Sequence, residues 1–296
     1  MRLRANPIAV GTVRVPIQLA AGLVLLLYAW PMAWFGNPPL SEHTFFPIWL
    51  GYVLSVDGLV LLRSGSSLLS RNKSEFLGLF VASIPVWWMF EFANHFLDNW
   101  RYLRPGEASW FATRIEGSAS FSTVIPALFV TSELYATTRL GRHKLTFFRI
   151  NPSDRKLIAI AVAGACLFLL SLAIPKYFFP FVWLGIFFAL DPINALAGQP
   201  SIAKQVAQNN WNTVVILFAA GLTCGFFWEM WNYWSMPKWV YEIRYGDQYK
   251  LFEMPALGYG GYLPFALEVY AIYQFLRLII RKRERAFLRF DKTGEP

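Results

Sequence analysis

Eight long apolar runs, separated by shorter polar segments, divide this chain of 296 residues. Each run is close to the roughly 20 apolar residues that an α-helix needs to cross the hydrocarbon core of a membrane. The pattern therefore predicts an all-α, polytopic membrane protein in which eight transmembrane helices form a bundle. The predicted helices are 15–35, 44–62, 76–96, 121–138, 157–174, 177–197, 213–234 and 257–280.

Three segments of the first half recur in the same order in the second half. "FFPIWLGYVLSVD" resembles "FFPFVWLGIFFALD", "FEFANHFLDNWRY" resembles "WEMWNYWSMPKWVY", and "ELYATTRLGR" resembles "EVYAIYQFLR". The offset to the equivalent residue is 134 positions from Trp49, 138 from Glu91 and 135 from Glu133. Three matches in one order predict a duplication, with two parallel repeats related by an axis along the membrane normal.

The predicted organisation follows from this repeat. A cytoplasmic N-terminal segment (1–14) precedes a first four-helix repeat (15–138). A basic cytoplasmic linker (139–156) leads to a second four-helix repeat (157–280), and a basic cytoplasmic tail (281–296) follows.

Composition supports a lipid environment. Only 15% of the residues are charged and 56% are hydrophobic, whereas a soluble domain carries about 25% charged residues. We therefore expect membrane lipids to surround the bundle.

Basic residues gather at four places, and eight spans would put all four on one side of the membrane. This positive-inside pattern predicts two cytoplasmic termini in a membrane such as the bacterial inner membrane. The net charge of +9 does not indicate nucleic acid, because the basic residues lie in loops and the tail and not on one face. The four groups are Arg2, Arg4 and Arg14; Arg63, Arg71 and Lys73; Arg139, Arg142, Lys144, Arg149, Arg155 and Lys156; and Arg277, Arg281, Lys282, Arg283, Arg285 and Arg289.

Six carboxylates fall inside the predicted helices as three repeat-related pairs. An ionisable group at membrane depth is costly, so each should face the bundle interior and be paired, protonated or hydrated. In both halves an asparagine follows a glutamate by three residues, which places amide and carboxylate on one helix face. The candidate catalytic residues are Glu91 and Glu229, Asn94 and Asn232, and Glu133 and Glu268.

Asp57 and Asp191 form the third carboxylate pair, and the sequence allows two interpretations of it. They are either structural groups near helix ends or part of a substrate-binding site.

Aromatic residues crowd the predicted outer ends of the helices, where an aromatic belt is expected. Trp228, Trp231 and Trp234 recur every third residue, so they cannot all face lipid while Glu229 points inward. Some should line a cavity with the carboxylate, where rings stabilise positive charge. The candidate substrate-binding residues are Trp228, Trp231, Trp88 and Tyr233, with Asp57 and Asp191.

The sequence indicates no metal centre and no cofactor. Cys166 and Cys224 are too few for a thiolate metal site or a disulfide framework. The histidines are scattered, and nucleotide-binding fingerprints are absent from the sequence.

The segment "WVYEIRYGDQYKLFEMPALGYGGYLPFALEVY" resembles tandem membrane-type lycopene cyclase domains, which also duplicate a small aromatic-rich helical unit. Those domains place two adjacent acids soon after a proline, whereas here Glu268 stands alone four residues after Pro264. The resemblance implies an isoprenoid substrate.

Three hypotheses for function follow. The first is an intramembrane enzyme that uses acid–base chemistry on an isoprenoid or other lipid-soluble substrate, in a cavity towards the non-cytoplasmic side. The second is a transporter or ion-conducting protein whose paired carboxylates bind a proton or cation. The third is an accessory subunit that binds a partner in a larger membrane complex.

Overall fold

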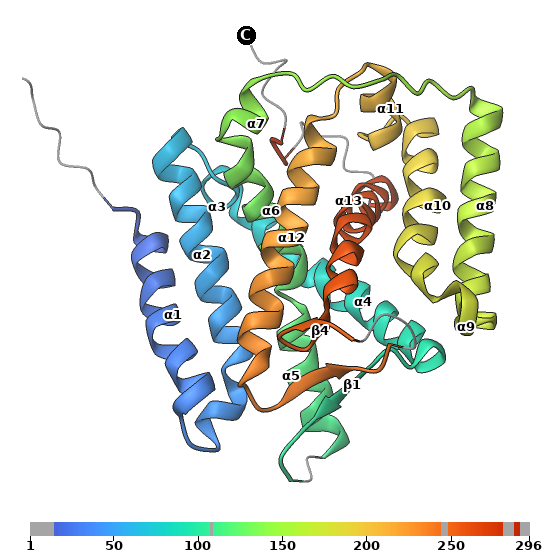
Figure 1. Cartoon of the computed structure of the whole chain (residues 1–296). Helices are drawn as coiled ribbons and strands as arrows, with labels where there is room; N and C mark the ends of the chain where they lie inside the picture. Colours follow the sequence, from blue (N-terminus) through green and yellow to red (C-terminus); the bar gives the residue numbers. More distant parts are fainter. Residues whose placement is uncertain (1–14, 107–108, 244–247, 281–286, 291–296) are drawn as a thin grey trace, which may run out of the picture.

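The computed structural model describes residues 15–106, 109–243, 248–280 and 287–290 (Figure 1). The predicted N-terminal segment and most of the predicted tail lie outside these residues. The helices are α1 (Ile17–Phe35), α2 (Phe45–Ser64), α3 (Leu68–Arg71), α4 (Lys73–Leu97), α5 (Trp110–Phe121), α6 (Val124–Ala136), α7 (Arg139–Arg142), α8 (Asp154–Ala173), α9 (Pro175–Phe178), α10 (Val182–Leu196), α11 (Ile202–Ala207), α12 (Asn212–Tyr233) and α13 (Tyr262–Ile279). Three 3₁₀ segments are η1 (Leu40–His43), η2 (Phe179–Phe181) and η3 (Ala256–Gly261), and the strands are β1 (Trp100–Leu103), β2 (Lys238–Tyr241), β3 (Lys250–Leu251) and β4 (Met254–Pro255).

Six of the eight predicted runs form helices long and apolar enough to cross a membrane. They are Ile17–Phe35, Phe45–Ser64, Lys73–Leu97, Asp154–Ala173, Pro175–Leu196 and Asn212–Tyr233. The all-α class is confirmed, and these helices are those of a membrane-embedded protein.

The fourth and eighth predicted spans differ from the other six. Helix α6 has 13 residues, which at 1.5 Å per residue is about 20 Å, less than the hydrocarbon thickness. Helix α13 has 18 residues but carries Glu268, Gln274 and Arg277 among its buried side chains. Most residues of both helices are buried against other helices.

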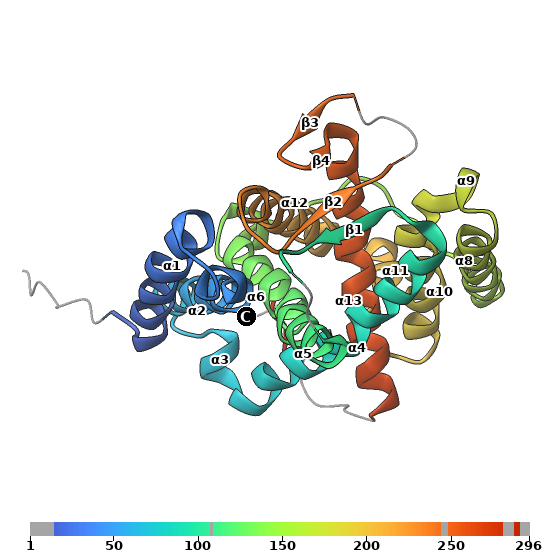
Figure 2. The ribbon, with the colours of Figure 1, turned by 90° about the horizontal axis from the view of Figure 1, so that it is seen from below.

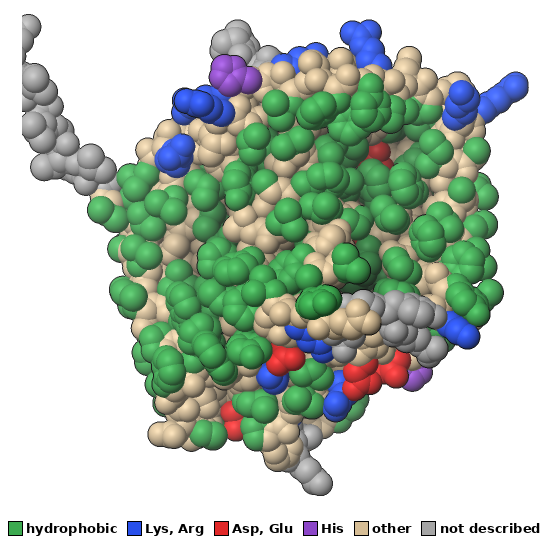
Figure 3. Space-filling view, viewed as in Figure 1, with side chains coloured by type: hydrophobic (Ala, Val, Ile, Leu, Met, Phe, Trp, Pro, Cys, Tyr) green, Lys and Arg blue, Asp and Glu red, His purple; other side chains and the backbone are tan. Residues whose placement is uncertain are grey.

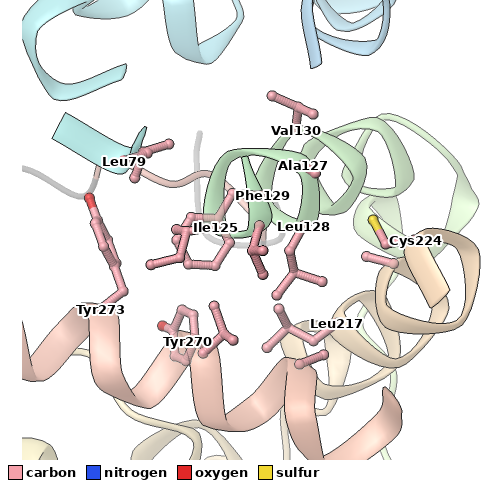
Figure 4. Close-up of a cluster of buried hydrophobic side chains, with 14 of the residues drawn as sticks. Leu79, Ile125, Ala127, Leu128, Phe129, Val130, Leu217, Cys224, Tyr270 and Tyr273 are labelled. Carbon is pink, nitrogen blue, oxygen red and sulfur yellow. The ribbon is translucent and has the colours of Figure 1, made fainter. Parts of the chain in front are cut away.

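Helix α6 lies at the centre of the bundle. In Figures 1 and 2, α1 and α2 lie on one side, α8 and α10 on the other, and α6, α12 and α13 between them. Every residue of α6 from Val124 to Glu133 is buried. Figure 4 shows Leu128 and Phe129 of α6 among Leu217 of α12 and Tyr270 and Tyr273 of α13.

Glycines let the peripheral helix pairs approach closely. A Cβ atom on Gly58 of α2 would lie 2.6 Å from the Cβ of Leu19 on α1. A Cβ atom on Gly185 of α10 would lie 2.7 Å from the backbone nitrogen of Phe168 on α8. Small residues at such crossings are typical of helix packing in membranes, where close backbone contact replaces the hydrophobic driving force.

Strands β1 and β2 pair in antiparallel fashion and connect the two halves at one end of the bundle (Figure 2). Trp100 lies opposite Tyr241, and Tyr102 lies opposite Trp239. Each strand follows the end of a long helix, α4 or α12, so the ladder fixes the ends of these helices relative to each other.

Hydrophobic side chains cover the middle of the face in Figure 3. Lys and Arg lie along its upper edge, and Lys, Arg, Asp and Glu lie together near its lower edge. At the upper end, Phe287, Leu288 and Phe290 of the C-terminal segment are buried. The ring centroid of Phe290 is 5.7 Å from that of Phe129. This part of the tail therefore contacts protein.

We expect Gly58→Ala to destabilise the protein, because the new methyl group overlaps Leu19 and forces α1 away from α2. The loss should be about 1–3 kcal/mol, measured as a lower thermal unfolding midpoint in detergent. Gly78→Ala is the matched control, since a Cβ there meets no atom within 4 Å and alanine favours helix. Equal behaviour of the two variants would contradict close packing of α1 on α2.

Candidate functional site

A cavity of about 310 Å³ lies between the two halves, directly inside the β1–β2 ladder. Most of its wall is aromatic, and no Asp, Glu, Lys, Arg or His is among the described residues that line it. The wall is formed by Phe45, Trp87, Asn99, Trp100, Tyr102, Ser120, Phe121, Val124, Phe179, Pro180, Trp183, Trp228, Trp239, Tyr241, Ile243, Met254, Pro255, Leu257, Gly258, Gly261, Tyr262 and Phe265. The lining residues Pro180 and Leu257 are exposed, so the cavity reaches the surface between η2 and η3.

Glu91 of α4 lies behind this wall and is held by three of its side chains. Its Oε1 accepts hydrogen bonds from Trp87 Nε1 at 2.9 Å, from Trp100 Nε1 at 3.2 Å and from the Tyr102 hydroxyl at 2.6 Å. All three donors line the cavity. The carboxylate is therefore one side chain away from any bound molecule.

Glu229 of α12 has the same relation to the wall and is fully buried. Its Oε1 accepts hydrogen bonds from the hydroxyls of Tyr241 at 2.7 Å and Tyr262 at 2.6 Å. Trp239 Nε1 donates in turn to the Tyr241 oxygen at 3.0 Å. The second carboxylate oxygen, Oε2, is buried and has no hydrogen-bond partner in the described part of the chain.

The two asparagines bind strand backbone and not the glutamates. Asn94 donates to the carbonyl of Trp100 at 2.7 Å and accepts from its amide nitrogen at 3.3 Å. Asn232 donates to the carbonyl of Trp239 at 2.8 Å and accepts from its amide nitrogen at 2.9 Å. Each amide thus aligns the strand whose aromatic side chains reach the glutamate of its own helix.

Glu91 accepts a hydrogen bond from a tryptophan of its own helix, whereas Glu229 accepts one from a tyrosine of α13. Trp87, four residues before Glu91, donates to it, whereas Gly225 lies four residues before Glu229. A Cβ atom on Gly225 would lie 2.3 Å from the ring of Tyr262. The missing side chain leaves the space through which Tyr262 of α13 reaches Glu229.

The strand tyrosines are hydrogen-bond donors at neutral pH. Burial, and then the charge of Glu229, raise the pKa of Tyr241 well above its ordinary value. Burial and the charge of Glu91 likewise raise the pKa of Tyr102, whose ring is partly exposed while its hydroxyl contacts the carboxylate. The two glutamates therefore act as acceptors towards the wall.

The four predicted aromatic residues occupy different places. Trp228 lines the cavity. Trp231 is buried on another side of α12, where its ring lies 5.0 Å from that of Trp49. Trp88 faces Arg114 at 4.6 Å, and Tyr233 lies 5.7 Å from Phe252; neither lines the cavity.

Asp57 and Asp191 hold the N-termini of two short helices. Asp57 accepts from the Ser67 hydroxyl at 2.7 Å and from the Leu69 amide at 3.1 Å, at the start of α3. Asp191 accepts from the amides of Ile202 at 2.7 Å and Ala203 at 2.9 Å, at the start of α11. These contacts agree with the interpretation of the pair as helix-end groups.

Glu133 and Glu268 lie away from the two other glutamates and have unequal surroundings. Glu133 is paired with Arg71 of α3 and accepts from the Arg289 amide at 3.0 Å. Counting from the capped helix starts, Gln205 of α11 stands where Arg71 stands in α3. Glu268 is fully buried near the backbone of Ile186, and no side chain among the described residues donates a hydrogen bond to it.

The side chains that donate hydrogen bonds to Glu91 and Glu229, or to Tyr241 beside Glu229, were not among the predicted site residues. These are Trp87, Trp100, Tyr102, Trp239, Tyr241 and Tyr262. A signal for four of them was present, because the aligned segments end in Trp-Arg-Tyr and Trp-Val-Tyr. For metal binding, the described residues contain no group of three or more His, Cys, Asp or Glu that could hold an ion.

Comparisons with protein-family models, with curated proteins and with solved structures find no match to this chain.

We expect Asn232→Ala to loosen β2, because the variant leaves the amide and carbonyl of Trp239 without their side-chain partner. Leaving buried backbone groups unsatisfied should reduce stability by about 2 kcal/mol, measured by thermal unfolding in detergent. Limited proteolysis should cut near 238–241 faster in this variant. Asn151→Ala, at an exposed position, should change neither measurement, and a similar response of both variants would contradict the role of Asn232.

Proposed function

We propose that this chain is an integral membrane protein of two tandem four-helix units, with a cavity between them that binds a lipophilic molecule. The observation that carries this proposal is the aromatic cavity with a hydrogen-bonded glutamate behind its wall on each side. Ligand sites are typically concave and mostly apolar with a few convergent polar groups, and this cavity has that character.

Equivalent contacts in the two halves support the tandem units. Tyr102 donates to Glu91 as Tyr241 donates to Glu229. Asn94 binds the carbonyl of Trp100 as Asn232 binds that of Trp239. The caps made by Asp57 and Asp191 are a second equivalent pair. An antiparallel ladder in which each tryptophan lies opposite the other half's tyrosine is the pairing expected for two units related by a twofold axis.

The polar groups favour acid–base chemistry on the bound molecule over ion transport. Glu91 and Glu229 are joined by hydrogen bonds to Tyr102 and Tyr241, whose side chains line the cavity. These pairs suit a role in moving a proton at a ligand. The transport hypothesis relied on Asp57 and Asp191, and both aspartates accept hydrogen bonds at the start of short helices. Transport therefore has less support than acid–base chemistry. We have no observation that favours an accessory subunit.

The resemblance to membrane-type lycopene cyclase domains remains a hypothesis for the substrate class. It rests on the aromatic run before Glu268, which lies one helical turn beyond the cavity residue Phe265. An isoprenoid would suit the apolar wall.

We also propose that the end with the β1–β2 ladder faces the non-cytoplasmic side and that both termini are cytoplasmic. In intact bacterial cells, a membrane-impermeant maleimide should label Trp110→Cys, which is 72% exposed at the ladder end. It should label Asn151→Cys only after permeabilisation. The reverse labelling pattern would contradict the proposed orientation.

We expect the purified protein to carry a lipophilic molecule, such as a polyene, quinone or prenyl lipid, that is enriched over the host membrane. Solvent extraction and mass spectrometry would identify it. The molecule should be depleted in the double variant Glu91→Gln, Glu229→Gln and retained in Glu75→Gln, which lies in the first turn of α4 and does not line the cavity.

Each variant must elute as a single species in size-exclusion chromatography, so that loss of the molecule does not reflect unfolding. Recovery of bulk phospholipid alone from the wild-type protein would overturn the proposal. Once the substrate class is known, the double variant should lose turnover.

A further inference from the structure

Two acidic groups, Glu91 and Glu229, lie directly behind the cavity wall. Among the described residues, every side chain that lines the cavity is neutral. Glu91 and Glu229 contact five of these lining side chains from outside, Trp87, Trp100, Tyr102, Tyr241 and Tyr262. Neither glutamate forms an ion pair with a described residue.

Three basic side chains near the cavity are paired with other acids. Arg101 pairs with Glu242, Arg104 with Glu116, and Lys238 with Glu253. These three basic residues are therefore not available to pair with Glu91 or Glu229. Arg114, whose charge acts on Glu91, stacks on the rings of Trp88 at 4.6 Å and Trp110 at 5.4 Å.

Two further features add to the negative character of the cavity. Aromatic faces attract cations through their quadrupole, most strongly in tryptophan, and five tryptophans line the wall: Trp87, Trp100, Trp183, Trp228 and Trp239. In addition, Glu229 Oε2 is a buried acceptor that no described donor satisfies. A positive charge in the cavity would interact favourably with both, and a phosphate or carboxylate would be repelled.

We propose that the ligand of this cavity is a lipophilic organic cation, a hydrocarbon group that carries an amine or quaternary ammonium. This inference rests on the proposed function, because it specifies the class of lipophilic molecule that the cavity binds. The hydrocarbon part contacts the phenylalanine and aliphatic residues of the wall, and the cationic group lies against tryptophan and tyrosine rings close to Glu91 and Glu229.

Two probes of matched shape test this inference, benzyltrimethylammonium and its neutral isostere neopentylbenzene. Binding of each is measured by tryptophan fluorescence in lipid nanodiscs, for wild type and for Glu91→Gln, Glu229→Gln. We expect the double variant to bind the cation about tenfold or more weakly, because the two acidic groups behind the ring faces are lost. Binding of the neutral probe should weaken far less than that of the cation, and Asp154→Asn, which removes an exposed carboxylate on α8, should bind both probes as wild type does.

The outcomes separate this inference from the proposed function. If both probes bind and the double variant affects neither, or weakens both equally, the cationic ligand is overturned while the lipophilic cavity stands. If neither probe binds the wild-type protein, the proposed function fails as well.

A second pair of variants locates the probe. Trp228→Leu removes a ring from the cavity wall, whereas Trp231→Leu removes an equally buried ring outside it. We expect only Trp228→Leu to weaken benzyltrimethylammonium binding, by several-fold. Equal weakening in both variants would overturn the assignment of the cation to this cavity.

Discussion

Every carboxylate buried in this bundle needs hydrogen-bond donors from the protein, because lipid supplies none. Asp57 and Asp191 obtain them from the first amides of α3 and α11. Glu91 and Glu229 obtain them from aromatic side chains of β1 and β2. The short helices and the ladder therefore exist where they do partly because a buried acid stands beside each of them.

This requirement also builds the cavity. A strand that offers tryptophan and tyrosine donors to a glutamate has to lie across the helix end, and Asn94 and Asn232 fix it there through backbone hydrogen bonds. Pairing of β1 with β2 then closes the space between the halves from one end. The rings that donate hydrogen bonds to the glutamates also line the cavity. The same side chains therefore stabilise the carboxylates and form the ligand site.

The sequence predicted the fold class and the central residues better than it predicted their contacts. Of the eight predicted spans, six are helices long and apolar enough to cross a membrane. Hydropathy could not show that α6 and α13 are packed on protein over most of their length, because an apolar residue that packs on protein looks the same as one that faces lipid. Spacing placed Glu229 and Asn232 on one face of a helix, but it could not show that the amide binds Trp239, since that contact depends on the course of the chain seven residues later. For the same reason Trp231 was a candidate for the cavity, although the rotation of α12 turns it towards Trp49.

The two halves differ at the residues that contact their buried glutamates. Arg71 neutralises Glu133, whereas Gln205 occupies the equivalent place and Glu268 has no counter-charge among the described residues. Trp87 supports Glu91, whereas Gly225 admits Tyr262 to Glu229. In each comparison the second half buries its acid more completely and leaves a buried carboxylate oxygen without a side-chain donor among the described residues. A twofold-related pair of sites that served only to hold helices together would have no need of this inequality, so the second half is where a ligand would meet the less satisfied acid.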